Sequence, residues 1–136
     1  MKPPVDTVRV GKKGRDILLK LKRNTGIDNW NILCRWALCA SLREPKCPAI
    51  SKSSSDGGVE MSWKVFAGEQ SDMFASLVIN RAIKDGYDNS LEDRAEYLKA
   101  HITRGLDYLG SGYETKSIGA FLVRWGLDGA KSAPEN

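Results

Sequence analysis

The sequence predicts a mainly α-helical, single-domain protein that has one short N-terminal strand and forms oligomers. Three observations lead to this fold class. Apolar residues recur at helical spacing through most of the chain, only one short stretch alternates as a strand does, and one helix is too apolar for a monomer to cover. The length of 136 residues, the hydrophobic content of 41% and the charged content of 28% suit one globular domain.

The strand is predicted at residues 6–10, where DTVRV alternates polar and β-branched residues. Val8 and Val10 then lie on one face, and Thr7 and Arg9 lie on the other. A strand of this length is not stable alone. Because no second stretch of similar character follows closely, pairing with the same strand of another subunit is one solution.

The first helix is predicted at residues 12–24, and Gly26 suits the left-handed position that ends a helix. Basic residues cover most of its surface, and Leu19 lies among them. The apolar side is a single stripe formed by Gly14, Ile17, Leu18 and Leu21.

The second helix is predicted at about residues 29–43, with Asp28 as its N-terminal cap. It is apolar nearly all round, and only Asn31 and Arg35 form a polar strip. A helix of this kind is a buried helix. Because one thin helix layer on each side would not cover it, we expect subunits to bury it together. The apolar residues are Trp30, Leu33, Cys34 and Ala37 on one side and Ile32, Trp36 and Cys39 on the other.

The second half of the chain is predicted to add two longer helices. Residues 71–85 form a helix that stops at Gly86, and Ser90 with Asp93 resembles a capping box that opens a helix over residues 91–109. Residues 59–69 form a short extended segment or a single turn, and residues 117–127 form a short terminal helix. The single domain, residues 1–136, therefore has four parts: a basic strand–helix–helix part at 5–43, an exposed loop at 44–58, a helical part at 59–110 and a C-terminal extension at 111–136.

Charge is unevenly distributed along the chain. Residues 1–52 contain 12 Lys and Arg against 4 Asp and Glu, whereas residues 53–136 contain 9 Lys and Arg against 13 Asp and Glu. A basic part joined to an acidic part predicts a polyanion-binding face on one side only.

The order strand, basic helix, turn and second helix is that of a ribbon–helix–helix DNA-binding unit. The start of the chain is therefore predicted to be ribbon–helix–helix-like and to bind DNA. Lysine-rich surfaces mostly contact phosphate, and one Arg and one Thr per strand read few base edges. We expect binding to the DNA backbone with little sequence specificity. The candidate phosphate contacts are Arg9, Lys12, Lys13, Arg15, Lys20, Lys22 and Arg23.

The sequence shows no catalytic, metal or cofactor site. Cys34 and Cys39 are five residues apart and do not converge on one ligand, and Cys47 in the loop lacks a CxxC partner. Two buried helical thiols and one loop thiol are the simplest interpretation. His101 is the only histidine, and its place beside the apolar stripe near Tyr97 and Tyr108 indicates a packing role. We therefore expect a protein that is not an enzyme.

Three longer words stand out in the chain: LKRNTGIDNWNILCRWALCASL at residues 21–42, EMSWKVFAGE at 60–69 and HITRGLDYLG at 101–110. Together they resemble the DndE family of DNA sulfur modification proteins. The resemblance spans roughly residues 5–110 and does not cover the tail. It implies a small helical protein of the bacterial system that replaces a non-bridging oxygen of the DNA backbone phosphate with sulfur.

The resemblance further implies a DNA-binding role, nicked duplex as the preferred ligand, a homotetramer and contacts with the other modification proteins. It carries over no catalytic residue. Since the N-terminus lacks a signal-peptide run and no membrane span is present, we expect a cytoplasmic protein. Two alternatives remain open. One is an enzyme of the same pathway, either a nicking nuclease or a sulfur carrier that uses Cys34, Cys39 or Cys47. The other is a scaffold that binds partner proteins through its acidic third and fourth helices.

Overall fold

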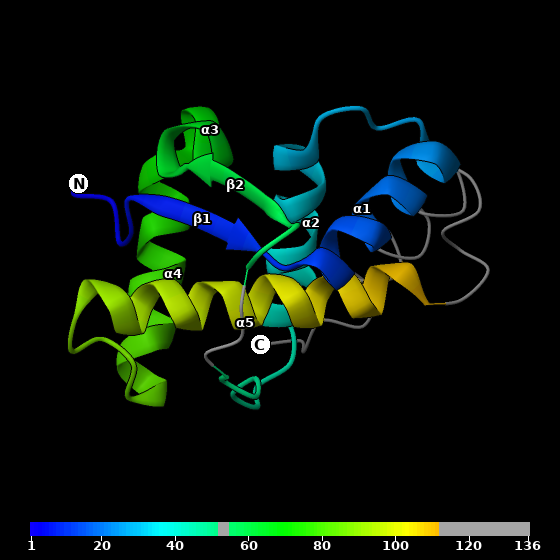
Figure 1. Cartoon of the computed structure of the whole chain (residues 1–136). Helices are drawn as coiled ribbons and strands as arrows, with labels where there is room; N and C mark the ends of the chain where they lie inside the picture. The colour runs from blue at the N-terminus through cyan, green and yellow to red at the C-terminus, as the bar shows by residue number, and fades with distance from the viewer. Residues whose placement is uncertain (52–54, 112–136) are drawn as a thin grey trace, which may run out of the picture.

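The computed structural model describes residues 1–51 and 55–111. In this part of the chain, five α-helices pack with one two-stranded antiparallel sheet at the surface (Figure 1), which confirms the mainly helical fold class. A short 3₁₀ turn, Gly68–Gln70, links the third and fourth helices. The elements in chain order are β1 (Thr7–Val10), α1 (Lys12–Thr25), α2 (Trp30–Leu42), β2 (Val59–Ser62), α3 (Trp63–Ala67), α4 (Ser71–Asp85) and α5 (Leu91–Gly110).

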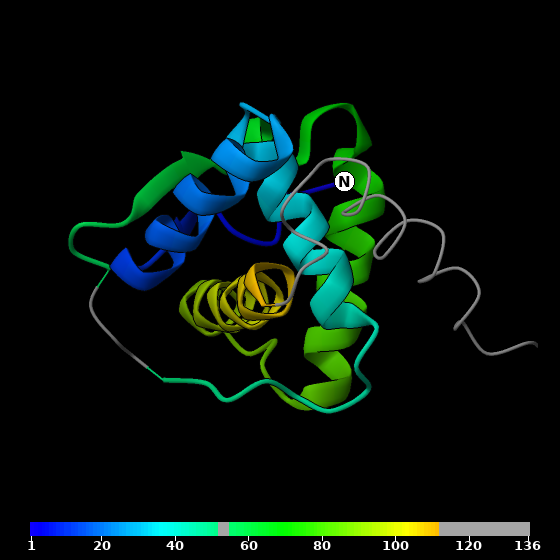
Figure 2. The ribbon, with the colours of Figure 1, turned by 90° about the vertical axis from the view of Figure 1, so that its right-hand side faces the viewer.

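The last helix, α5, is the axis around which the other elements pack. Viewed nearly end-on in Figure 2, it has α1, α2 and α4 beside and above it. Its closest neighbour is α2, because Gly105 lets the two backbones touch. A Cβ atom built at Gly105 would lie 1.7 Å from the carbonyl oxygen of Ala37, so no larger residue fits without moving a helix. The apolar stripe of α5 lies in the core and includes Leu98, Ile102, Leu106 and Leu109.

The partner of β1 is β2 of the same chain. The two strands are antiparallel, with Thr7 opposite Ser62, Arg9 opposite Glu60 and Val10 opposite Val59. The suggested pairing of β1 with the same strand of another subunit is therefore replaced by a pairing within the chain. Residues 59–69, predicted as an extended segment or a single turn, contain both, because β2 is extended and the short helix α3 follows it. The pairing itself was not predicted, since β2 is only four residues long and its VEMS sequence alternates weakly.

The helix ends follow the sequence signals except at α2. Gly26 and Gly86 take left-handed conformations after α1 and α4, and the Ser90 side chain accepts a hydrogen bond from the backbone N–H of Asp93 at the start of α5. The predicted Asp28 cap of α2 was wrong. The cap position is Asn29, and its side chain makes no capping hydrogen bond.

The second helix, α2, is only half buried within one chain. Leu33, Cys34, Ala37 and Leu38 are fully covered by the core. Ile32 and Trp36 remain partly exposed, and Cys39 is exposed, so the expectation of two buried helical thiols was wrong for Cys39. The sequence could not show which side the chain itself covers, because both sides of α2 are apolar.

The loop after α2 is not exposed throughout, because Pro48 is buried and Cys47 is half-buried. The predicted terminal helix at 117–127 lies outside the described residues. Among residues 1–51 and 55–111, none of the helices combines the length and apolar character that a membrane crossing requires.

Candidate nucleic-acid interface

The outward face of α1 gathers six of the seven candidate DNA contacts. The helix lies at one edge of the molecule, and its buried residues, which include Gly14, Leu18 and Leu21, face the core. Its other side is therefore turned to solvent. The six exposed cations of this α1 basic face are Lys12, Lys13, Arg15, Lys20, Lys22 and Arg23.

The cations are arranged in two rows on the α1 basic face. At about 100° per residue, Lys13 and Lys20 lie on one flank, and Arg15 and Lys22 lie on the opposite flank. Members of each row are two turns apart, which is about 10 Å along the axis. Between the rows run the remaining exposed residues, Lys12, Asp16, Leu19 and Arg23.

Most of these charges are not used by the fold. Lys20 donates a hydrogen bond from Nζ to the carbonyl oxygen of Gly110 at 2.9 Å, at the C-terminal end of α5. Within the described part of the chain, the other five make no hydrogen bond or ion pair. Five positive charges on one short helix therefore lack partners in the described fold. They form a surface whose charge a polyanion can neutralise.

Arg9, the seventh candidate, lies on the sheet and is paired. The strand alternation places Arg9 on the outward face, as predicted, because Val8 and Val10 are buried. Its Nη2 atom lies 3.5 Å from Oε1 of Glu60 across the strand pair, and both side chains are about half exposed. The sequence did not predict Glu60 as a neighbour, because the pairing of the extended segment at residues 59–62 with β1 was not predicted. The sheet face therefore offers DNA a neutral pair rather than a free cation.

The arginines of the other helices have a different role, because each one binds main-chain carbonyl oxygens. Arg81 on α4 donates to the carbonyl oxygens of Leu42 and Glu44. Arg104 on α5 donates to the carbonyl oxygen of Lys46 at 2.7 Å and to that of Ser41 at 2.8 Å. Together they fix the chain where it leaves α2. These guanidinium groups are occupied by the fold and are poor candidates for phosphate contacts.

Arg35, the lone charge in the body of α2, joins two of the three family-like words. Its Nη1 atom donates to the carbonyl oxygen of Phe66 at 3.0 Å, next to the end of α3. Asn31, one turn earlier, donates to the carbonyl oxygen of Val65 at 3.0 Å. Gly68 takes φ 61°, and a Cβ atom there would lie 2.9 Å from Nη1 of Arg35. The polar strip of α2 is thus a clamp on α3.

The third family-like word completes this scaffold through His101. The Ser41 hydroxyl lies 2.7 Å from Nδ1 of His101, and it also accepts a hydrogen bond from Nε of Arg104 at 2.8 Å. The Ser41 hydroxyl can donate to Nδ1 of a neutral His101 or accept from it, according to which ring nitrogen carries the proton. Burial, followed by the positive charges of Arg104 and Arg81, lowers the pKa of His101 from 6.5 to about 4. The ring edge packs on Tyr97, as the predicted packing role requires.

The thiols are poorly suited to nucleophilic chemistry. Burial raises the pKa of the Cys34 thiol to about 12. Desolvation by the neighbouring side chains also raises the pKa of Cys39, although part of this residue is exposed, and it acts against the opposing effect of Arg35. Desolvation together with Asp85 raises the pKa of Cys47. A thiol rather than a thiolate at neutral pH is a weak nucleophile. In the described ranges, no group of three or more His, Cys, Asp and Glu side chains could hold a metal ion.

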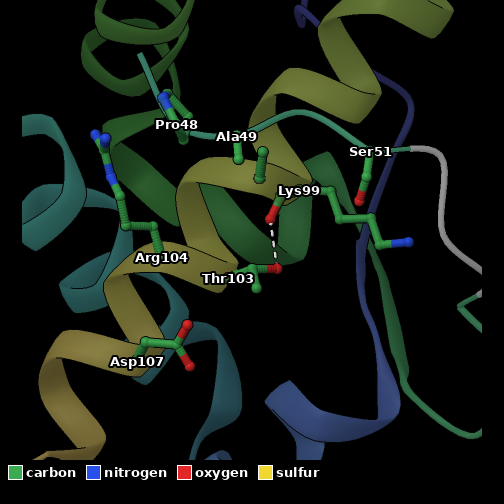
Figure 3. Close-up of a pocket in the computed structure, with 8 residues that line it drawn as sticks. Pro48, Ala49, Ser51, Lys99, Thr103, Arg104 and Asp107 are labelled. Carbon is green, nitrogen blue, oxygen red and sulfur yellow. Dashed lines mark hydrogen bonds between the residues drawn. The ribbon is translucent and has the colours of Figure 1, made fainter. Parts of the chain in front are cut away.

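A hollow of about 270 Å³ lies between α5 and the loop that follows α2. Its cationic neighbours do not converge on it. Figure 3 shows that Lys99 and Arg104 leave α5 in opposite directions. Lys99 donates to the Ser55 hydroxyl at 2.8 Å, and Arg104 binds the carbonyl oxygens described above. The hollow therefore lacks the paired charges of a phosphate site, and the α1 basic face remains the better candidate.

Comparison with known proteins agrees with the three words. The model of the family described as DNA sulphur modification protein DndE matches residues 7–117, which is most of the chain. No curated protein matches the chain. The match includes the α1 basic face and every element of the scaffold that Arg35, Arg81 and Arg104 hold together. The chain belongs to the DndE family of DNA sulphur modification proteins.

Proposed function

We propose that this protein is a DNA-binding component of the DNA sulphur modification machinery and that it holds the DNA backbone with the α1 basic face. The observation that carries the proposal is the set of five exposed cations on α1 that the described fold leaves without a hydrogen bond or ion pair. A face made mostly of lysines, which contact phosphate rather than base edges, suits a modification whose target is the backbone phosphate itself. The protein would act in the cytoplasm, where it would meet the other modification proteins.

The face should bind with little sequence specificity. Four of the six cations are lysines, which act toward DNA as point charges on phosphate. The arginine of the outward sheet face, Arg9, is paired with Glu60 and does not offer a free fork to a guanine. Base readout from the sheet, as in a ribbon–helix–helix protein, is therefore less favoured than phosphate contact from α1.

Oligomerisation through α2 would multiply this face. The outward side of α2 carries an open apolar patch lined by Ile32, Trp36 and Cys39, with Arg35 at its edge. A neighbouring apolar hollow at the end of α2 includes Leu42 and Leu77. A second copy covering these surfaces would remove them from water. We propose a homotetramer, which presents several α1 basic faces and can hold both sides of an interrupted duplex such as nicked DNA.

No catalytic role is part of the proposal. The raised thiol pKa values weigh against a cysteine-based sulfur carrier, and no arrangement of the described residues favours nuclease chemistry. A scaffold role toward the other modification proteins is compatible with DNA binding and would use surfaces away from α1.

The test is charge reversal with a matched control. Lys12, Arg15 and Arg23 are changed to Glu in one variant, and Lys2, Lys46 and Lys64, three exposed lysines outside α1, are changed to Glu in the other. Both variants change the net charge equally. We expect the α1 variant to lose at least about 100-fold in affinity for duplex DNA, measured by fluorescence anisotropy, and the control to lose far less. Equal losses would show a net-charge effect and contradict the proposed face.

A further inference from the structure

We propose that Leu19 gives the α1 basic face a preference for DNA whose base stacking is interrupted, because its side chain contacts base surface that an intact duplex hides. The inference rests on the proposed DNA-binding role and deepens it. It assigns a specificity-determining residue to a face that otherwise contacts only phosphate.

Leu19 lies in the middle of the α1 basic face. It is 41% exposed, and it is the one large apolar residue of α1 that is exposed in the described structure. It follows Arg15 by one turn and precedes Arg23 by one turn, so it lies between the two cation rows and near the middle of the helix. When phosphates approach both rows, Leu19 faces the DNA.

The α1 basic face combines charged groups, which act on phosphate, with one apolar side chain, which does not. Phosphate contacts cannot distinguish an intact from a nicked duplex well, because the two carry almost the same backbone charge. An apolar side chain gains nothing from phosphate and must be covered by apolar surface to contribute. Base faces provide such surface, and they are accessible only where a step is opened. Proteins that bend DNA use leucine and similar side chains as wedges at such steps.

An interruption lowers the cost of this contact. Opening a continuous step costs a few kcal/mol of unstacking, whereas a nick or gap has already lost part of the restraint that keeps the step closed. Leu19 should therefore strengthen binding to nicked and gapped duplexes and contribute little to binding of an intact duplex of the same sequence.

The decisive variants are Leu19→Ala and Leu19→Lys. Affinities for intact, nicked and one-nucleotide-gapped duplexes of one sequence are measured at fixed salt, with thermal unfolding as a check on folding. We expect Leu19→Ala to weaken binding to the interrupted duplexes by about three- to tenfold and to leave binding to the intact duplex nearly unchanged. Leu19→Lys should weaken binding to interrupted duplexes although it adds a positive charge.

The sign of the Leu19→Lys effect decides the question. If α1 contacts phosphate alone, the added charge tightens binding to all three duplexes equally, and this result would overturn the inference. Leu91→Lys is the matched control, because Leu91 is also about half exposed but lies at the far end of α5. It should not change the preference among the duplexes.

Failure of the inference and failure of the proposed function give different results. Asp16→Asn removes the single negative charge of the α1 basic face and should tighten binding to all three duplexes if DNA binds there. A tighter Asp16→Asn variant together with a tighter Leu19→Lys variant would leave the face in place and discard the role of Leu19. No effect of either substitution on any duplex would contradict both the face and the role of Leu19.

Discussion

The cations of α1 and the arginines of the other helices carry the same positive charge. Most of the α1 cations are exposed and unbound, whereas the other arginines hold parts of the fold together. Five cations of α1 make no hydrogen bond or ion pair in the described structure, whereas Arg35, Arg81, Arg94 and Arg104 each donate to main-chain carbonyl oxygens far away in the sequence. The two sets lie on different elements, and Figures 1 and 2 both place α1 and α4 on opposite sides of the molecule.

Positive charge in this fold is divided between residues that hold the structure together and residues that remain available for binding. A guanidinium group has five N–H donors in a fixed plane, so it can hold two or three carbonyl oxygens at once. Arg104 does this at the exit of α2, and Arg94 does it for Pro4 at the N-terminal segment. The cations of α1 other than Lys20 hold no part of the described fold and remain available. The net charge of +4 therefore understates what α1 offers to a polyanion.

The largest effect on stability is expected at Arg104. In Arg104→Ala, three acceptors at Ser41 and Lys46 lose a charged donor, and the hydroxyl that holds His101 loses its restraint. We expect the free energy of unfolding to fall by about 2–4 kcal/mol in urea denaturation. Arg104→Lys keeps the charge but cannot reach all three acceptors, so it should recover less than half of the loss. Full recovery by lysine would show that charge alone matters there.

The buried His101 predicts a pH dependence of similar origin. In the folded protein its pKa is lowered to about 4, whereas in the unfolded chain it takes up a proton near pH 6.5. The unfolded state therefore binds more protons between these values, and stability is lost as the pH falls through that window, by about 3 kcal/mol at most.

The check compares the parent protein with His101→Gln, whose side-chain oxygen can still accept from Ser41. Denaturation at several pH values between 5 and 7 should give a smaller slope for the variant, since the carboxylates contribute equally to both. Parallel curves for the two proteins would show that His101 is protonated in the folded state as well.

A smaller loss is expected when the clamp between α2 and α3 is removed. Arg35→Ala deletes the donor to the carbonyl oxygen of Phe66 while leaving α1 untouched. Stability should fall by about 1–2 kcal/mol, and affinity for DNA at temperatures well below unfolding should not change. A large loss of affinity with unchanged stability would mean that Arg35 binds DNA and does not only hold α3.

The smallest effect is expected at the cross-strand pair on the sheet. Glu60→Gln removes the negative partner of Arg9 and frees its guanidinium group. Because both side chains are exposed and screened, affinity for DNA should rise by only about two- to threefold, with a slightly steeper salt dependence. A decrease in affinity would mean that Glu60 positions Arg9 for DNA rather than opposing it.

The sequence predicted the helices well. It did not show which charged residues have partners in the fold and which remain free. Local signals such as Gly26, Gly86 and the Ser90 cap act within a few residues, so the ends of α1, α4 and α5 could be predicted closely. The pairing of β1 with β2 joins residues that are far apart in the chain. An extended conformation was one of the two predicted for this segment, but its partner could not be predicted, because the surrounding packing decides how such a short segment pairs.

The candidate interface was predictable in composition but not in detail. The spacing of Gly14, Leu18 and Leu21 defines the buried side of α1, so the exposure of its cations followed directly. That Arg9 faces Glu60, or that Lys20 caps the end of α5, depends on tertiary contacts that periodicity does not contain. The same limit applies to Arg35, whose carbonyl partner lies 31 residues away.

The salt dependence of DNA binding is the sharpest measure of whether the cations of α1 bind phosphate. The logarithm of affinity is measured against the logarithm of salt concentration for the parent protein and for a variant in which Lys12, Arg15 and Arg23 are changed to Gln. If these cations bind phosphate, the slope should become shallower by about 0.9 for each phosphate that is no longer neutralised, or about 2.7 for three phosphates per subunit. Removal of the guanidinium group of Arg35 should leave the slope unchanged. An unchanged slope in the α1 variant would contradict the claim that α1 is where DNA binds.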